Sequence, residues 1–385
     1  MKRIGFFIGQ IITVGSIWCM AQPVAAADPV IRVLLTTTDF TSRYHESVTI
    51  SYNGKEVIYK ADELKNQEYK VRIPAQKNGI RIMSIERQSG NPVYEGSIEI
   101  IPKEEGLTIV NELTLENYLD RVVPSEMPAS YEKEALKAQA VCARTYAWKQ
   151  IQEHSLPDFD ADVDDSVSYQ VYGNIEPQET STEAVKETEG QIMTQNGEAV
   201  EAYYFSTSAG VTSTDEIWGS TKAAPYLKSV PCSFDAEEPW SSWTLELPRE
   251  LLEEKIRDKE GKEEQFLSAA VVRRSESGAA TGLEVVTDEN SFEIRNEYEI
   301  REFLAPVGCM ITEKDGTQTK GGILLPSAYF KLEKEQSGNL LIIGKGYGHG
   351  VGMSQTGANR MAEQGYDYRK ILDYFFQNIA IENLG

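Results

Sequence analysis

The sequence predicts an α+β fold, in which a β-rich N-terminal portion precedes a mixed α/β core with a long alanine-rich helix that lines a cleft. Residues 31–110 alternate short β-branched runs with turn residues, which is the pattern of antiparallel strands. After residue 111 the chain reads as a short helix, a proline-bounded turn and a long helix. Strands and helices that are segregated along a chain are typical of the α+β class.

Composition limits the functions that the chain can have. Its 385 residues are enough for two or three domains or lobes. The net charge of -22 argues against nucleic acid as a partner, because phosphate backbones are bound by basic patches. Beyond the leader, Cys142, Cys232 and Cys309 are odd in number and widely spaced, so we expect them to pack in the core rather than to form disulfides.

The N-terminus has the pattern of an export leader. Lys2 and Arg3 precede an apolar run over 4–20, and "AAA" at 25–27 precedes Asp28. Residues 1–27 are therefore expected to be a signal peptide or an N-terminal membrane anchor. Either way the protein would act outside the cytoplasm, anchored in the membrane or secreted.

The β-rich portion is expected to span 28–110, with runs such as "VIRVLL", "SVTISYNG" and "EGSIEIIP" forming mostly antiparallel strands. The remaining 111–385 is expected to form the core domain. Within it, the charged stretch 237–265 reads as a helical insertion or lid.

The long helix is predicted to open at Ser130, with Glu132 and Glu134 in its first turns. Lys137 and Arg144 are seven residues apart, so they lie near one face and could reach the same ligand, although both could equally be solvated. The alanines permit close packing against a neighbour; they are Ala135, Ala138, Ala140, Ala143 and Ala147.

Two loop segments carry polar side chains. The acidic stretch "LPDFDADVDDSVSYQVYG" suggests calcium but fails the EF-hand pattern, because Val163 and Tyr169 stand where glycine and glutamate belong. Residues 197–230 read as a strand that runs into a Ser/Thr/Gly loop, and such a loop offers hydroxyls to a sugar or a phosphate.

The stretch "GKGYGHGVGMSQTGANRMA" places glycine at every second position from Gly344 to Gly352. If this segment is extended, one face is bare and the other carries side chains that include His349. The G-x-G-x-x-G dinucleotide motif does not fit in any register. The segment is expected to enter a helix that is capped by Ser354 and ends near Gly365.

Three separated segments carry a family resemblance. They are "VVPSEMPASYEKEALKAQAVCARTYA" (122–147), "YYFSTSAGVTSTDEIWG" with "YLKSV" (203–230), and "GKGYGHGVGMSQTGANRMAEQGYDYRKILDYFF" (344–376). With these segments the chain resembles the stage II sporulation protein D family, a group of peptidoglycan-acting proteins whose domain also occurs in an amidase-enhancer subgroup.

The resemblance implies a lytic transglycosylase that cleaves the MurNAc–GlcNAc bond of peptide-stripped glycan strands and leaves 1,6-anhydroMurNAc ends, in sporulation and engulfment. It also implies that the catalytic acid is the glutamate of the V-V-x-x-E-M-P segment, here Glu126. Physical chemistry agrees, because protonating the leaving oxygen needs a carboxyl that stays protonated near neutral pH. Without the resemblance, Glu126 could simply serve the helix that follows it.

Further residues follow from the resemblance as candidate substrate contacts. Lys137 and Arg144 would face the cleft and hold oxyanion charge or the lactyl carboxylate. His349 would brace the site through hydrogen bonds, although a histidine satisfied in the core is the alternative. The remaining candidates are Gln170, Tyr172, Ser206, Thr207, Ser208 and Gln355.

The family's zinc-binding members use cysteines near a "C-D-x-x-x-C-Q-V-Y" stretch, where this chain has Asp164 and Tyr169. We therefore expect no zinc and no other cofactor. The expected partners are glycan strands, a cell-wall amidase and a membrane partner of the sporulation machinery. The alternative function is a non-catalytic, glycan-binding enhancer of a cell-wall amidase. A metal-dependent hydrolase is disfavoured because histidines do not cluster.

Overall fold

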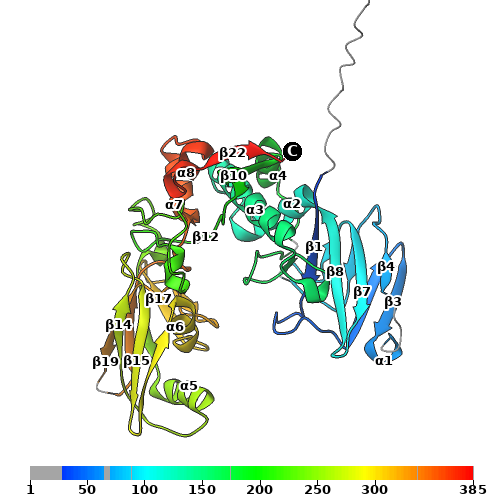
Figure 1. Ribbon diagram of the computed structural model, residues 1–385. Helices are drawn as coiled ribbons and strands as arrows, with labels where there is room; N and C mark the ends of the chain where they lie inside the picture. Colours follow the sequence, from blue (N-terminus) through cyan, green and yellow to red (C-terminus); the bar gives the residue numbers. More distant parts are fainter. Residues whose placement is uncertain (1–27, 65–69, 88, 174, 336, 385) are drawn as a thin grey trace, which may run out of the picture.

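The computed structural model describes residues 28–64, 70–87, 89–173, 175–335 and 337–384 (Figure 1). Helices and strands are both abundant, which confirms the α+β class. The expected leader over 1–27 lies outside the described residues. Among the residues that are described, no helix is long and apolar enough to cross a membrane.

The N-terminal portion forms two sheets, as the alternating pattern predicted (Figure 1). Their strands pair antiparallel, except that β1 and β9 are parallel. The five-stranded sheet has the order β4-β7-β8-β1-β9, with β1 (Val30–Leu35), β4 (Val71–Ile73), β7 (Ser97–Pro102), β8 (Leu107–Thr114) and β9 (Val163–Asp164). The four-stranded sheet has the order β3-β2-β5-β6, with β2 (Ser47–Tyr52), β3 (Lys55–Lys60), β5 (Ile80–Ile82) and β6 (Val93–Tyr94); α1 (Ala61–Leu64) follows β3.

Strand β9 comes from the acidic loop, well beyond residue 110, so this loop completes the N-terminal sheet. Asp162 accepts from the backbone N–H of Arg32, while Asp164 pairs with Arg43 and Asp165 with Arg87. The acidic stretch therefore fastens the core to the N-terminal portion through charge pairs, and the two portions share one hydrophobic cluster.

A helical layer follows the sheet. It contains α2 (Leu115–Glu126), α3 (Lys133–Glu153) and α4 (Glu179–Glu187), and α2 is capped by the Thr114 hydroxyl, which accepts from Asn117 N–H. The five alanines of α3 are completely buried, which confirms their packing role; the neighbours are mainly α2, α4, α7 and β10. Helix α3 begins at Lys133, three residues after the predicted start, and the free N–H of its N-cap residue Glu132 donates to Asn359 Oδ1 on α7.

Two small sheets join the middle of the chain to its end. One has the order β11-β10-β22, with β10 (Gln191–Gln195), β11 (Glu198–Ala199) and β22 (Ala380–Asn383). The other pairs β12 (Tyr204–Phe205) in parallel with β21 (Met353–Ser354), and α7 (Gln355–Glu363) and α8 (Tyr368–Phe375) follow. Ser354 caps α7 as predicted, since its hydroxyl accepts from Gly357 N–H.

The remaining strands form a third region, which lies at the lower left of Figure 1. One sheet has the order β18-β17-β13-β20-β19, with β13 (Trp243–Leu247), β17 (Met310–Glu313), β18 (Gln318–Lys320), β19 (Phe330–Lys334) and β20 (Leu340–Gly344). The other has the order β14-β15-β16, with β14 (Phe266–Arg274), β15 (Ala280–Thr287) and β16 (Ser291–Arg295). Helices α5 (Arg249–Glu260) and α6 (Glu297–Phe303) pack here, and short 3₁₀ turns lie at Pro157–Phe159, Asp215–Trp218 and Pro239–Ser241.

The charged stretch 237–265 contains α5, in line with the helix expected there, and also β13, which is the middle strand of the five-stranded sheet and buries Trp243 and Leu247. One prediction for this region needs correction. The glycine-rich stretch is not a regular extended strand, since each glycine from Gly346 to Gly352 has a positive φ. At Gly352 a Cβ would lie 2.0 Å from the carbonyl oxygen of Tyr203. The glycines therefore allow an irregular backbone to press against β12.

Candidate functional site

Glu126 is the last residue of α2, and the local sequence explains its position. Met127 precedes Pro128, and the residue before a proline is pushed out of the helical region. Met127 accordingly has φ -134 and ψ 133, and its N–H closes the helix on the carbonyl of Val123. The glutamate side chain is thereby presented at the open end of a helix that is fixed by buried residues.

The surroundings of Glu126 raise its proton affinity. The residue is half-buried, and burial raises the pKa of its carboxyl to about 7. Two hydrogen-bond donors act in the opposite direction on this pKa, the Val171 N–H and the Tyr204 hydroxyl. The Val171 N–H donates to Glu126 Oε1 at 2.6 Å. The carboxyl is therefore close to half protonated at neutral pH.

Neutral polar side chains support this carboxyl. Gln170 Nε2 donates to the Tyr204 hydroxyl at 3.1 Å, and its Oε1 accepts from the Tyr118 hydroxyl at 3.3 Å. Gln355 Nε2 donates to the main-chain carbonyl of Glu126 at 3.1 Å, so α7 holds the end of α2. Within the described residues, none of the causes of the raised Glu126 pKa is a charged group. The structure thus brings Gln170 and Gln355 to Glu126 as supporting residues.

Lys137 and Arg144 lie on one side of α3, as their spacing indicated, but helix α4 covers that side. Arg144 is completely buried and forms two 2.7 Å bonds to the carboxylate of Glu116. The side chain of Lys137 is 13% exposed and pairs with Glu134 at 2.9 Å and Glu187 at 3.5 Å. The structure therefore directs both cations to acidic partners inside the fold, and does not bring them to Glu126.

The hydroxyl-rich run 206–208 belongs to a buried network around Asp235. Ser208 donates to Asp235 through its N–H at 2.7 Å and its hydroxyl at 2.8 Å, and Ser354 donates at 2.7 Å. Thr207 is 2% exposed, and its hydroxyl lies 3.3 Å from that of Thr356. Ser206 is half-buried, and its carbonyl accepts from Thr356 N–H. No sequence pattern pointed to Asp235, since a single aspartate in a loop is usually solvated.

His349 and Tyr172 both have internal partners. His349 Nδ1 accepts from Val351 N–H at 3.1 Å, and burial lowers the pKa of this imidazole to about 3, so the ring is neutral at physiological pH. Its ring packs against those of Tyr203, Phe205 and Trp218. Tyr172 is completely buried and its hydroxyl donates to Asn111 Oδ1 at 3.0 Å.

Metal-ligating side chains do not gather anywhere in the described part of the chain, where no group of three or more His, Cys, Asp or Glu could hold an ion. His154 Nδ1 lies 3.1 Å from Asp162, and Asp164 bonds to Ser166 as well as to Arg43. Tyr169 packs against the hydrophobic core.

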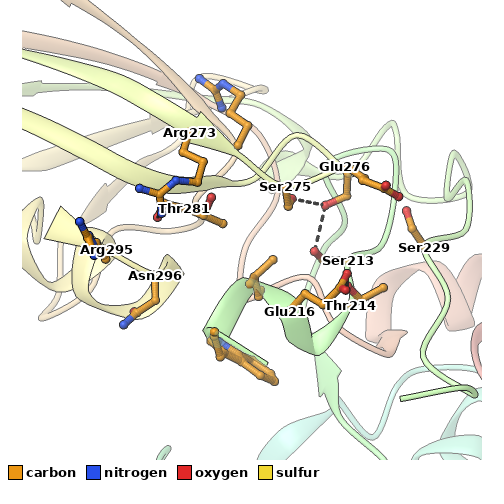
Figure 2. Close-up of a pocket in the computed structure, with 15 residues that line it drawn as sticks. Ser213, Thr214, Glu216, Ser229, Arg273, Ser275, Glu276, Thr281, Arg295 and Asn296 are labelled. Carbon is orange, nitrogen blue, oxygen red and sulfur yellow. Dashed lines mark hydrogen bonds between the residues drawn. The ribbon is translucent and has the colours of Figure 1, made fainter. Parts of the chain in front are cut away.

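A separate pocket of about 550 Å³ (Figure 2) adjoins the His349 ring cluster through Trp218. Trp218 lines it and packs edge-on against His349 and Tyr203, each with ring centroids 5.1 Å apart. Glu126 does not line this pocket. The molecule thus carries an acid with a raised pKa and a separate pocket that is bordered by an aromatic ring of the His349 cluster.

Comparisons with known proteins place this arrangement in a family. A family model described as Stage II sporulation protein matches residues 103–195, which include Glu126 and its partner Val171. A second model, a domain of unknown function (DUF8618), matches residues 229–352. The first match covers α2, which carries the acid, together with α3 and β9.

Similar proteins cover most of the chain. Stage II sporulation protein D of Bacillus subtilis (strain 168) is 33% identical over 286 residues, which are 71% of this chain and 75% of that protein. An uncharacterized protein of Brachyspira hyodysenteriae (strain ATCC 49526 / WA1) is 34% identical over 292 residues, 75% of this chain and 72% of that protein. The Amidase enhancer of Bacillus subtilis is 30% identical over 295 residues, 68% of this chain but 40% of that protein. The chain belongs to the stage II sporulation protein D family, as the resemblance indicated.

Proposed function

We propose that this protein is a lytic transglycosylase that acts outside the cytoplasm on peptidoglycan glycan strands from which the stem peptides have been removed. One observation carries the proposal: Glu126 has a carboxyl whose pKa is about 7, at an open helix end among neutral hydrogen-bonding side chains. A general acid works best when its pKa lies near the working pH.

The reaction needs only one such group. Protonated Glu126 donates its proton to the O4 leaving oxygen of N-acetylglucosamine as the bond to C1 of N-acetylmuramic acid breaks. The C6 hydroxyl of the same muramic acid attacks C1, and its proton passes to the Glu126 carboxylate. Glu126 ends protonated again, no water is consumed, and the product carries a 1,6-anhydro end.

The neutral surroundings of Glu126 suit this cycle better than they suit hydrolysis. A hydrolase of the common kind requires a second carboxylate, either to activate water or to attack C1. The groups that adjust the pKa of Glu126 are instead a backbone N–H and the Tyr204 hydroxyl. Such donors allow the carboxyl to alternate between both protonation states, whereas an adjacent cation would hold it ionised.

Incubation of the chain with amidase-denuded glycan strands tests the proposal, with 1,6-anhydro ends detected by mass spectrometry. The unmutated chain should form these ends, and Glu126→Gln should reduce their formation by on the order of 10²-fold or more while strand binding persists. Glu176→Gln is a matched control, because the side chain of Glu176 is 74% exposed at the surface. Near-normal product formation by Glu126→Gln would place the acid elsewhere.

A second candidate function is supported by the similarity to the Amidase enhancer. In that case the chain would bind glycan strands and dock a cell-wall amidase without cleaving the strands itself. Absence of anhydro ends with the unmutated chain, together with strand binding and faster turnover by an added amidase, would favour this function. A membrane partner in sporulation is a further proposal that rests on the same family membership.

A further inference from the structure

The pocket that Trp218 lines, next to the His349 ring cluster, has arginines along one side. Figure 2 shows Arg273, Arg295 and Asn296 together on the β14–β16 side, facing the loop that carries Ser213, Thr214 and Glu216. Arg274 also lines the pocket. In a chain of net charge -22, a group of three arginines at one pocket is a local exception, because the protein as a whole repels anions.

The sheet register explains how two of these arginines come together. Arg273 on β14 and Arg295 on β16 both pair with Gly282 on the strand between them. A Cβ at position 282 would lie 2.9 Å from the Cβ of Arg273 and 2.9 Å from Glu293 Oε1. Gly282 has no positive φ, so the glycine is needed here for space. It lets the Arg273 side chain and the Glu293 carboxylate lie over the middle strand.

The guanidinium groups keep unused hydrogen-bond donors. Each carries five N–H groups. Arg273 and Arg295 share one carboxylate, that of Glu293, which orients both and balances only one of the two charges. Arg274 donates to the carbonyls of Gly278 at 2.8 Å and Phe330 at 2.7 Å. Within the described residues, no acidic group lies within ion-pair distance of Arg274.

The rest of the pocket offers groups that suit a sugar. Its inner wall is a chain of hydroxyls, in which Ser213 lies 2.9 Å from Ser277, and Ser277 lies 3.0 Å from the hydroxyl of Tyr329. Ser213 N–H donates to the carbonyl of Gly350, so this wall rests on the glycine-rich segment. Glu216 and Glu276 can accept from sugar hydroxyls, and Trp218 supplies an apolar surface. The volume of about 550 Å³ falls within the range of small-ligand sites.

The pocket is also connected to the acid. Trp218 lines the pocket and packs against Tyr203, while the hydroxyl of the next residue, Tyr204, acts on Glu126. The pocket wall is therefore linked to the carboxyl through the ring contact of Trp218 with Tyr203, the residue that directly precedes β12.

We propose that this pocket is a remote subsite for the free lactyl carboxylate of an N-acetylmuramic acid in a denuded glycan strand, bound by the guanidinium groups of Arg273, Arg274 and Arg295. This inference rests on the proposed function for its substrate class. An amidase that removes the stem peptide converts an uncharged amide into a carboxylate on each muramic acid. Planar guanidinium groups bind carboxylates through paired hydrogen bonds, so the pocket selects denuded strands over peptide-bearing ones.

Binding measurements in the Glu126→Gln background test this subsite apart from catalysis. Arg295→Glu should weaken the binding of denuded strands by about tenfold or more, because it removes a charge-assisted contact and adds repulsion. The variant should fold normally, since the side chain of Arg295 is 72% exposed and makes one 3.3 Å bond to Glu293. Arg81→Glu is the matched control, because Arg81 is an exposed strand arginine of the N-terminal portion and gives the same change in net charge.

A second binding experiment uses denuded strands whose muramic acid carboxyls have been chemically reduced to alcohols. Reduced strands should bind the unmutated pocket about as weakly as denuded strands bind Arg295→Glu, and the variant should show no further loss with them. Equal losses for Arg295→Glu and Arg81→Glu, or an undiminished effect of Arg295→Glu with reduced strands, would overturn the assignment. Competition by inorganic phosphate that exceeds competition by free N-acetylmuramic acid would also overturn it in favour of a phosphate site.

The two proposals can fail separately. If anhydro ends never form but Arg295→Glu still weakens strand binding, the subsite stands and the transglycosylase proposal falls. If anhydro ends form at the normal rate and neither Arg295→Glu nor Arg81→Glu weakens strand binding, the transglycosylase proposal stands and the subsite falls.

Discussion

The side-chain amide of Gln355 donates to the main-chain carbonyl of Glu126, and thereby ties the start of α7 to the last turn of α2. A helix end leaves its final carbonyls without intrahelical partners, so a side chain that supplies a donor fixes the orientation of that turn. The position of the Glu126 carboxyl is therefore set partly from outside its own helix.

Gln355→Ala is expected to lower kcat by about tenfold with a small change in KM, because it loosens the turn that aims the carboxyl. Steady-state formation of anhydro ends measures the effect. Gln364→Ala, at the exposed C-terminal end of the same helix, should leave kcat unchanged. Equal kcat values for the unmutated chain and Gln355→Ala would remove Gln355 from the supporting residues.

Tyr204→Phe should move the alkaline limb of the rate profile to higher pH. The Tyr204 hydroxyl lowers the pKa of Glu126, so its removal raises that pKa and keeps the acid protonated further into the alkaline range. The profile of kcat/KM against pH reports this value for the free enzyme. If the alkaline limb of the Tyr204→Phe profile stays in place or moves to lower pH, the hydrogen bond assigned between the Tyr204 hydroxyl and Glu126 is contradicted.

Glu126→Gln should also change how stability depends on pH. The folded pKa of about 7 lies above the ordinary value of 4.5, so the folded state favours the protonated carboxyl, and stability is lost as pH rises through 7. Glutamine cannot ionise, so the variant should match the parent near pH 4 and exceed it above pH 8 by up to about 3 kcal/mol. Urea denaturation at both pH values measures this, and a difference that does not grow with pH would refute the raised pKa.

Arg144→Met should act on stability rather than on glycan binding. It leaves Glu116 without its buried partner, which costs about 3–5 kcal/mol in the free energy of unfolding. The double variant Glu116→Leu with Arg144→Met should recover part of the loss, because no uncompensated charge remains. Strand affinity per folded molecule should be unchanged in both, and a specific loss of affinity would return Arg144 to the substrate site.

Gly352→Ala should be more destabilising than a glycine substitution that carries backbone strain alone. Gly190 has a similar positive φ, but a Cβ there meets nothing within 4 Å, so Gly190→Ala should cost about 1–2 kcal/mol. At Gly352 the clash with the Tyr203 carbonyl adds to this strain. Thermal unfolding of both variants separates the two contributions, and equal shifts in Tm would show that the close approach to β12 is unimportant.

Local chemistry made much of the fold predictable. The antiparallel strands, the buried alanines of α3 and the Ser354 cap all depend on neighbours within a few residues along the chain. The end of α2 was not predicted correctly: the sequence indicated a proline-bounded turn from Pro124 to Pro128, but α2 continues through Pro124 to Glu126 and ends only before Pro128. Long-range pairing could not be predicted: the spacing of Lys137 and Arg144 indicated their shared face, but nothing in it indicated that α4 covers that face.

The roles of Asp235 and Tyr204 also depend on long-range pairing, which could not be predicted from the sequence. Asp235 acquires its role only because Ser208 and Ser354 are folded against it, 27 and 119 residues away along the chain. The alternating glycines indicated a close approach, yet the positive φ angles that bend the segment depend on contacts with β12 that no local pattern encodes.

The bond between Gln355 and Glu126 joins residues that are 229 positions apart. Closure of a loop of that length is slow compared with the formation of a single helix, so the acid receives its support late in folding. A ribosome would have to release almost the whole chain before the carboxyl is held in place, and a chain shortened before α7 would retain Glu126 without the amide that aims it. Support of the Glu126 carboxyl by Gln355 thus requires that nearly the whole chain has been made.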